Sequence, residues 1–176
     1  MAIGIACRKF IVALGLVVGS LGVVTSSPAA AEDLIVAFGA SQTYGKGVSR
    51  EEAYPAQLEQ LLRLKGYDVR VVNSGVNGQT TGAMLQRLEK SVPAGTSLVI
   101  FQRGGNDKRK GVGDERAANI SEIRQRLSSR GIPVIMMENK VFRNYPRQVD
   151  GQHLTVAGCR GLAQSLVPKV AKFFSR

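Results

Sequence analysis

The sequence has no tryptophan, one histidine and two cysteines among its 176 residues. Cys7 lies in an N-terminal segment that has the features of a removable signal, which would leave Cys159 as the only thiol. An intramolecular disulfide is then excluded, and the burial of apolar side chains must hold the fold together. We expect Cys159 to be a small, buried helix residue rather than a nucleophile. Any chemistry that needs an imidazole depends on His153, although a lone histidine is more often structural than catalytic.

The first 31 residues have the pattern of a bacterial secretory signal peptide. Arg8 and Lys9 precede an uncharged apolar run at residues 10–24, and Ala29 and Ala31 form an A-x-A cleavage motif. We predict cleavage after Ala31, a single domain over residues 32–176, and a periplasmic or secreted location. An uncleaved membrane anchor is the alternative, and it is disfavoured because the run is short for a span of ~20 residues. Cys7 precedes the run, so it is not a lipoprotein acylation site.

The chain is strongly basic, with a net charge of +11, of which +9 remains after the predicted cleavage. The basic residues are scattered, and the sequence contains no stacking motif or recognition helix, so a nucleic-acid partner is not expected. Electrostatic contact with an anionic envelope surface is the functional interpretation of this charge. A basic surface that is merely solvated explains it equally well.

Apolar runs suited to buried strands alternate with segments of helical periodicity. The predicted strands lie within residues 33–41, 68–75, 97–107 and 132–139, and the predicted helices within residues 55–66, 80–92, 114–131 and 154–174. In the second helix we expect Leu85, Leu88 and Val92 to share a buried face, and in the last we expect Pro168 to bend or interrupt the helix. Strands that alternate with helices need crossover connections, which predicts a parallel sheet covered on both faces.

Small, polar and glycine-rich segments follow the predicted strands. They are "FGASQTYG", "NSGVNGQTT" and "RGGND", and after the fourth strand comes "QVDGQHLTVAG". Functional groups of such sheets collect beyond the carboxyl ends of the strands, so Ser41, Gly78, Asn106, Asp150 and His153 are expected at one edge. A serine nucleophile needs a neutral imidazole as base, a carboxylate that orients the imidazole, and N–H donors for the oxyanion. Ser41, His153 and Asp150 can fill the first three roles, and the backbone N–H groups of Ser41 and Gly78 with the Asn106 amide can fill the last.

Each of these signals has a simpler structural explanation when it is taken alone. Ser41 could be a turn former or helix cap, and Gly75 and Gly78 could only form a tight turn. Asn106 and Asp107 could form a turn with a side chain bonded to its own backbone. Asp150 could cap the last helix. The joint occurrence of the right residue types at the right strand ends favours the catalytic interpretation.

The four segments together resemble the SGNH hydrolase superfamily, also called GDSL esterases and lipases. "FGASQTYG" is similar to the serine block, "NSGVNGQTT" to the glycine block, "GGND" to the asparagine block and "DGQHLTVAG" to the D-x-x-H block. The resemblance extends from about Asp33 to Phe174. It implies a three-layer α/β/α, flavodoxin-like fold with a parallel sheet of four to five strands. It also implies Ser41, Asp150 and His153 as the catalytic triad, Ser41, Gly78 and Asn106 as the oxyanion hole, and no metal or organic cofactor.

The chain departs from the family pattern in two places. Ala40 stands where the family usually has the aspartate of G-D-S, which predicts altered local hydrogen bonding rather than lost chemistry. Only residues 140–149 separate the fourth strand from Asp150, where related enzymes generally have another helix and a fifth strand. A shortened wall of the substrate pocket is therefore expected.

The leading hypothesis is an exported serine esterase that hydrolyses small acyl or aryl esters, thioesters or lysophospholipids through an acyl-enzyme. One alternative is an O-deacetylase of envelope polysaccharide, and another is a non-catalytic envelope-binding module on a degenerate SGNH fold. A nucleotide binder is disfavoured because neither Walker spacing nor G-x-G-x-x-G occurs after the first strand. Lys108, Arg109 and Lys110 are candidates to line the entrance and favour anionic substrates, or they form an ordinary solvated loop.

Overall fold

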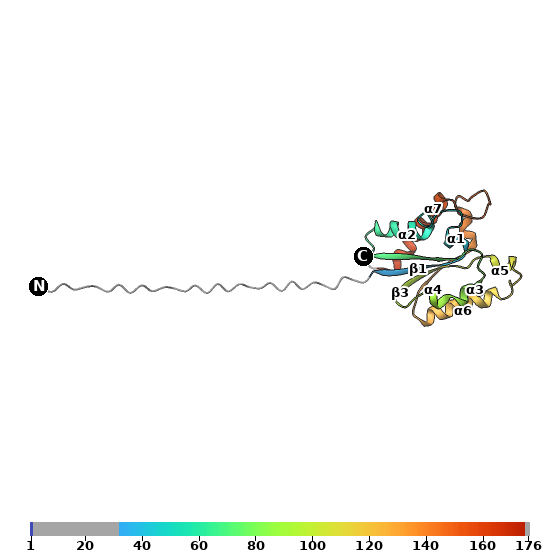
Figure 1. Ribbon diagram of the computed structural model, residues 1–176, viewed down its shortest axis with the longest axis horizontal. Coiled ribbons are helices and arrows are strands. Elements are labelled where there is room, and N and C mark those ends of the chain that lie inside the picture. The colour runs from blue at the N-terminus through green and yellow to red at the C-terminus, as the bar shows by residue number, and fades with distance from the viewer. Residues whose placement is uncertain (2–31, 175–176) are drawn as a thin grey trace. The chain divides into compact units, whose positions relative to one another are not determined.

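The computed structural model describes residue 1 and residues 32–174, so the predicted signal peptide and its cleavage site lie outside the described residues. Four strands form one parallel sheet in the order β2-β1-β3-β4 (Figure 1). The strands are β1 (Asp33–Gly39), β2 (Val69–Gly75), β3 (Thr96–Gln102) and β4 (Val134–Met137). This order is that of a flavodoxin-like doubly wound sheet, and it confirms the predicted α/β class.

The central strands β1 and β3 are buried on both faces, which explains their unbroken apolar sequences. The edge strand β2 alternates instead, with Val69 and Val71 buried and Arg70 and Val72 exposed. The two patterns follow from position, because a central strand is covered by helices on both sides. The predicted strand positions are confirmed, with ends that differ by a few residues.

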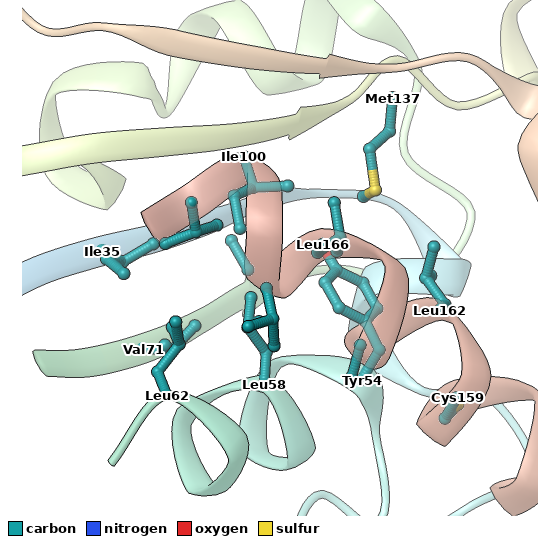
Figure 2. Close-up of a cluster of buried hydrophobic side chains, with 14 of the residues drawn as sticks. Ile35, Tyr54, Leu58, Leu62, Val71, Ile100, Met137, Cys159, Leu162 and Leu166 are labelled. Atoms are coloured by element: carbon teal, nitrogen blue, oxygen red, sulfur yellow. The ribbon is translucent and has the colours of Figure 1, made fainter. Parts of the chain in front are cut away.

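Helices cover both faces of the sheet (Figure 1). On one face α2 (Tyr54–Arg63) packs against α7 (Val156–Val170) and the sheet, and Figure 2 shows this core, in which Tyr54, Leu58 and Leu162 lie fully buried. On the other face lie α3 (Thr81–Gln86), α4 (Leu88–Ser91) and α6 (Arg116–Ser129). Cys159 belongs to the first core, is 1% exposed and has its thiol pKa raised to about 11 by burial. It is therefore the buried helix residue that was predicted.

The helix predicted over residues 80–92 is divided at Arg87 into α3 and α4. Leu88 and Val92 are buried as expected, but Leu85 is only partly buried, and Met84 takes the core position. Leu85 still packs against the same core cluster as Leu88 and Val92, so the predicted shared face is confirmed, with Leu85 at its margin.

The last helix continues through Pro168 to Val170 and then tightens into the 3₁₀ turn η2 (Ala171–Phe173). The predicted interruption at Pro168 was therefore wrong, because the helix ends two residues later. Leu162, Leu166 and Val170 are buried as the apolar stripe requires. Thr155, whose hydroxyl accepts a hydrogen bond from the Gly158 N–H, caps this helix, so Asp150 is free for another role.

No fifth strand follows β4 in the described part of the chain, as the short spacing before Asp150 predicts. The connection to α7 contains the 3₁₀ helix η1 (Asn139–Asn144) and one isolated antiparallel bridge between Arg147 and Leu154. Strand β4 is therefore a sheet edge, and Val134, Ile135 and Met136 are only partly buried. Within the residues described, no helix is long and apolar enough to span a bilayer.

Candidate active site

Ser41, His153 and Asp150 lie together beyond the carboxyl end of β1. His153 Nε2 is 3.0 Å from Ser41 Oγ, and His153 Nδ1 is 2.5 Å from Asp150 Oδ2. These are hydrogen-bonding distances on both sides of one imidazole ring. The arrangement can remove a proton from the serine hydroxyl while the carboxylate stabilises the imidazolium that forms.

The Asp150 carboxylate is held ionised by the bonds that it accepts. Its Oδ2 faces the His153 ring, and its Oδ1 accepts the backbone N–H groups of His153 at 2.9 Å and Gln152 at 2.8 Å. The His153 side-chain bond, followed by these backbone bonds, holds the pKa of Asp150 well below its usual range. The carboxylate remains 43% exposed while the imidazole is 4% exposed, so the base is buried but its orienting group is not.

Ser41 begins the short helix α1 (Ser41–Tyr44) directly after the β1 strand and Ala40. Ala40 is buried, and its N–H donates to the Gln102 side-chain oxygen at 2.7 Å. Gln102 also accepts from the Thr43 hydroxyl at 3.3 Å. The end of β3 thus supplies the hydrogen-bond acceptor at the turn that contains Ala40. Whether this bonding differs from that of relatives with an aspartate at this position stays a prediction.

Asn106 is the first residue of α5 (Asn106–Arg109) and is 4% exposed. Its Nδ2 donates to the Gln79 carbonyl oxygen at 2.8 Å, and its Oδ1 accepts from Arg109 Nη2. A guanidinium only donates and a carbonyl only accepts, so these partners permit one orientation of the amide. The second Nδ2 hydrogen remains for another acceptor, as a donor in an oxyanion hole requires.

Gly78 lies next to Gln79 in the loop between β2 and α3, with a φ of +70° that favours glycine. The Gln79 carbonyl joins this loop to Asn106, so the glycine and asparagine segments are brought together. Gly78 itself does not line the cleft that contains Ser41 and Asn106.

The Arg87 guanidinium lies behind the strand ends and uses all of its donors. Its Nε donates to the Gln79 side-chain oxygen at 2.5 Å, and its Nη2 donates to the Gly39 and Ser74 carbonyls, each at 3.0 Å. Its Nη1 donates to the Ser74 and Ser91 hydroxyls. The guanidinium carbon, Cζ, lies 4.4 Å from the centre of the Phe38 ring. Burial lowers the pKa of Arg87 to about 10, so it stays a cation at neutral pH. Arg87 therefore connects β1, β2 and the Gly78–Gln79 loop.

Two further contacts tie the strand ends together. A methyl group on Gly75 would lie 2.1 Å from the Tyr44 backbone nitrogen, so only glycine allows α1 to pack this closely on the end of β2. The buried Asp107 carboxylate accepts the Thr81 N–H at 2.9 Å and the Thr81 hydroxyl at 2.5 Å. Asp107 thus bonds to the start of α3 and not to its own turn, which corrects the simple-turn explanation.

The segment that contains Asp150 and His153 is held by hydrogen bonds, several of them from side-chain amides. Gln148 Nε2 donates to the Lys46 carbonyl at 2.8 Å and to the Leu154 carbonyl at 2.7 Å. The Gln148 N–H donates to the His153 carbonyl at 2.7 Å. Gln42, next to the serine, donates to the Gln152 carbonyl at 2.6 Å. The bonds of Gln148 to Lys46 and of Gln42 to Gln152 cross between the α1 region and the segment around His153, and the other two lie within that segment.

A cleft of about 470 Å³ opens beside Ser41, Asn106 and Asp150. It is lined mainly by glycine and polar side chains, and among its few apolar contacts are Ala40 and Phe142. Arg109 lines the cleft, whereas Lys108 and Lys110 are exposed outside it. Of the two alternatives for this segment, Lys108 and Lys110 fit the solvated loop, whereas Arg109 fits the basic entrance.

In the portion of the chain that the structure describes, no group of three His, Cys, Asp or Glu side chains could hold a metal ion.

Sequence reasoning missed Arg87, Asp107 and Gln148. Arg87 lies within a predicted amphipathic helix, where an arginine is normally a solvated residue, and the division of that helix was not predicted. Asp107 had a visible signal, since it follows Asn106 directly after a strand. Gln148 had none, because its partners at Lys46 and Leu154 are brought near it only by the tertiary fold.

Residues 37–171 match the GDSL-like Lipase/Acylhydrolase family. Among curated proteins the chain is similar to esterase TesA of Pseudomonas aeruginosa, with 29% identity over 75% of this chain and 67% of that protein. It is also similar to an arylesterase of Vibrio mimicus, with 30% identity over 70% of this chain and 62% of that protein. The chain thus spans about two thirds of the length of these relatives.

Solved structures agree with this placement. AlinE4, described as an SGNH-hydrolase family esterase, is 31% identical over 82% of this chain and 74% of its own, with a TM-score of 0.57. A TesA crystal structure, 21% identical, covers 81% of this chain and 100% of its own with a TM-score of 0.70, a likeness of fold.

Proposed function

Because the chain belongs to the GDSL-like lipase/acylhydrolase family of carboxylic ester hydrolases, with the SGNH fold, we propose that it is an exported serine esterase acting through Ser41, His153 and Asp150. The observation that carries the mechanism is the pair of contacts on the His153 ring, 3.0 Å to Ser41 Oγ and 2.5 Å to Asp150 Oδ2. The export rests on the secretory pattern of residues 1–31.

In the first half-reaction His153 Nε2 takes the Ser41 proton as Oγ bonds to the acyl carbon. The tetrahedral oxyanion then collapses, the bond to the alcohol oxygen breaks, and the alcohol leaves with the proton from His153. The Asp150 carboxylate holds Nδ1–H and so keeps Nε2 free as the base. In the second half-reaction His153 deprotonates a water that attacks the acyl-enzyme, which releases the acid and restores Ser41.

The oxyanion would be stabilised by the Ser41 N–H group and by the free Nδ2 hydrogen of Asn106, whereas Gly78 does not line the cleft and is given no donor role. The bonds that Asn106 makes to Gln79 and Arg109 support this role, because a donor that is already oriented needs no reorganisation when charge develops. Loss of such a donor typically costs ~10²–10³ in kcat.

The lining of the cleft favours short substrates. Its polar and glycine-rich walls offer little apolar surface for a long chain, and the missing fifth strand leaves the β4 edge uncovered. We therefore place small acyl and aryl esters ahead of thioesters and lysophospholipids. Deacetylation of a polysaccharide would use the same residues, and a non-catalytic module would not need the aligned triad.

A fluorophosphonate probe and p-nitrophenyl acetate test this proposal on the chain that begins at Glu32. The wild type should be labelled once and should turn over the ester, and Ser41→Ala should lose labelling. Ser41→Ala and His153→Ala should each lower kcat by ~10⁴-fold or more.

Ser129→Ala is the matched control, because Ser129 is exposed at the end of α6 and its hydroxyl bonds only to the Arg126 carbonyl. It should retain full labelling and turnover. A folded wild type that neither reacts with the probe nor hydrolyses the ester would refute the esterase proposal and favour the binding module.

A further inference from the structure

Three arginines from separate segments line the same cleft as Ser41. Arg109 lies at the end of α5, Arg143 lies in η1, and Arg147 lies three residues before Asp150. The only acidic side chain lining this cleft within the described residues is Asp150, which is bound to His153. The wall around the nucleophile therefore carries an excess of positive charge.

None of the three guanidiniums is neutralised by a carboxylate in the described part of the chain. Arg109 donates to Asn106 and Gln152, both neutral, and Arg147 donates to the Gly151 carbonyl at 2.7 Å. The Arg143 guanidinium makes no hydrogen bond or ion pair with any residue that the structure describes.

Some arginines elsewhere on the surface are neutralised. Arg63, Arg126 and Arg130 each pair with a glutamate. No glutamate of the described residues lines the cleft, and its one aspartate, Asp150, is bound to His153.

A cleft lined by one sign of charge concentrates the field within it, because the surrounding protein polarises less than water. A guanidinium also presents paired N–H donors that match the two oxygens of a carboxylate or phosphate. Arg143 and Arg147 retain free N–H donors that can bind a carboxylate or phosphate. The ester carbonyl does not need them, because separate donors for it exist at Asn106 and the strand ends.

We propose that Arg143 and Arg147, with Arg109 beside them, form a subsite for a carboxylate or phosphate that the ester substrate carries in addition to its scissile bond. This inference rests on the proposed esterase function and narrows it to anionic esters. Arg109 has a double role, since it also orients the Asn106 amide.

The test compares esters that differ in charge but share the reacting group. With the charge on the acyl side, 4-nitrophenyl hydrogen succinate is compared with its methyl ester. With the charge on the alcohol side, 4-acetoxybenzoate is compared with methyl 4-acetoxybenzoate. The measured quantity is the ratio of kcat/KM for the anionic ester to that for the neutral ester, at low ionic strength.

The wild type should prefer the anionic ester in at least one pair, and the pair that shows it identifies the side that carries the charge. Arg143→Gln and Arg147→Gln should each lower that ratio by about tenfold, the usual scale for a hydrogen bond to a charged group. Arg143→Glu should lower it further. Arg147→Gln loses the bond to the Gly151 carbonyl and could disturb its segment. Arg143 is exposed and its guanidinium has no bond to lose, so Arg143→Gln tests the subsite even if Arg147→Gln is perturbed.

Lys108→Gln and Lys110→Gln are the matched controls, because they remove the same charge from exposed positions outside the cleft. Their ratios should equal that of the wild type. If they lower the ratio as much as Arg143→Gln does, the preference is long-range attraction and the subsite is refuted. Equal rates for both members of each pair would also refute it while leaving the esterase proposal intact, whereas no hydrolysis and no fluorophosphonate labelling would refute both.

Discussion

The candidate nucleophile and its candidate base are held by different means. Ser41 follows a strand whose last five residues are buried, and its turn is packed against Gly75 so closely that no other side chain fits there. His153 lies in an irregular segment between η1 and α7, where side-chain amides provide much of the support. The first arrangement is stabilised by packing and the second by hydrogen bonds, so the two should respond differently to substitution.

The contrast has a physical reason in the shortened connection after β4. The end of a central strand is positioned by the whole sheet. The conformational entropy lost in ordering it is offset by the packing of the core. The segment of residues 145–155 contains no helix or strand, so its geometry depends on hydrogen bonds within the segment, such as those of Gln148 to His153 and Leu154, and on a few bonds to the α1 region. We therefore expect substitutions near Ser41 to change stability most and substitutions near His153 to change rate most.

Among the substitutions that test this contrast, the largest effect is expected for Asp150→Asn. The amide cannot stabilise the imidazolium and can bond to Nδ1 in the wrong tautomer, so kcat should fall by ~10³–10⁴-fold with little change in KM. Steady-state kinetics with p-nitrophenyl acetate measures this. A loss of less than tenfold would show that the exposed carboxylate does not orient the base.

The same variant also tests the contribution of the Asp150 carboxylate to stability, which depends on pH. Because the folded pKa of Asp150 is depressed, its stabilising contribution is fully present above the unfolded pKa of about 3.9 and is lost as the pH falls below that value. The difference in unfolding free energy between wild type and Asp150→Asn, measured in urea, should be greatest near neutral pH and shrink below about pH 4. A constant difference across this range would contradict the assignment.

Gly75→Ala tests the packed side. Its methyl group would lie 2.1 Å from the Tyr44 backbone nitrogen, so α1 must shift, and the free energy of unfolding should fall by about 3 kcal/mol. Urea denaturation measures this loss. Gly113→Ala is the control, since its methyl group would meet nothing closer than 3.7 Å, and it should leave stability nearly unchanged.

Arg87→Gln tests the connection between the two glycine-rich strand ends and the Gln79 loop. The variant loses the bonds to Gly39, Ser74 and Gln79, so kcat should fall by ~10–100-fold through a misplaced oxyanion donor, while KM changes less. Kinetics should be measured well below the melting temperature of the variant. Arg124→Gln, an exposed change on α6, should keep wild-type kcat. A Tm loss with unchanged kcat would make Arg87 purely structural.

Gln148→Ala should have the smallest effect. It removes two bonds that hold the base segment, and their loss should lower kcat about three- to tenfold and stability by only about 1 kcal/mol. Gln125→Ala on the exposed face of α6 is the control and should change neither quantity. A stability loss as large as that of Gly75→Ala would remove the contrast between the two sides.

The residue types at the strand ends were enough to predict which side chains the candidate site brings together, except that Gly78 does not line the cleft. Ser41 follows β1, Asn106 follows β3 and His153 follows the region after β4, and parallel strands bring their carboxyl ends to one edge. The four-stranded sheet was predictable for a related reason, because apolar runs alternated with helical periodicity. The division of the predicted helix at Arg87 and the continuation of α7 past Pro168 were not predicted.

The bonds that support the site could not be predicted in the same way. Arg87 and Gln148 bond to Gly39 and Lys46, which are distant along the chain, and the cleft arginines come together from separate segments. The sequence contexts of all these residues are those of ordinary surface residues. A polar side chain can bond to any group within reach, and which groups come within reach is decided only when the helices pack.

The sequence by itself determined the order of strands and helices, the family, and the identity of the candidate nucleophile, base and acid. Hydrophobic periodicity is local, and a lone histidine leaves no other choice of imidazole. Only the tertiary structure decided which arginine forms hydrogen bonds to the strand ends. It also decided which arginines line the cleft and that Lys108 and Lys110 do not. These are questions of direction in space, and side-chain direction is determined by packing between elements that are remote in sequence.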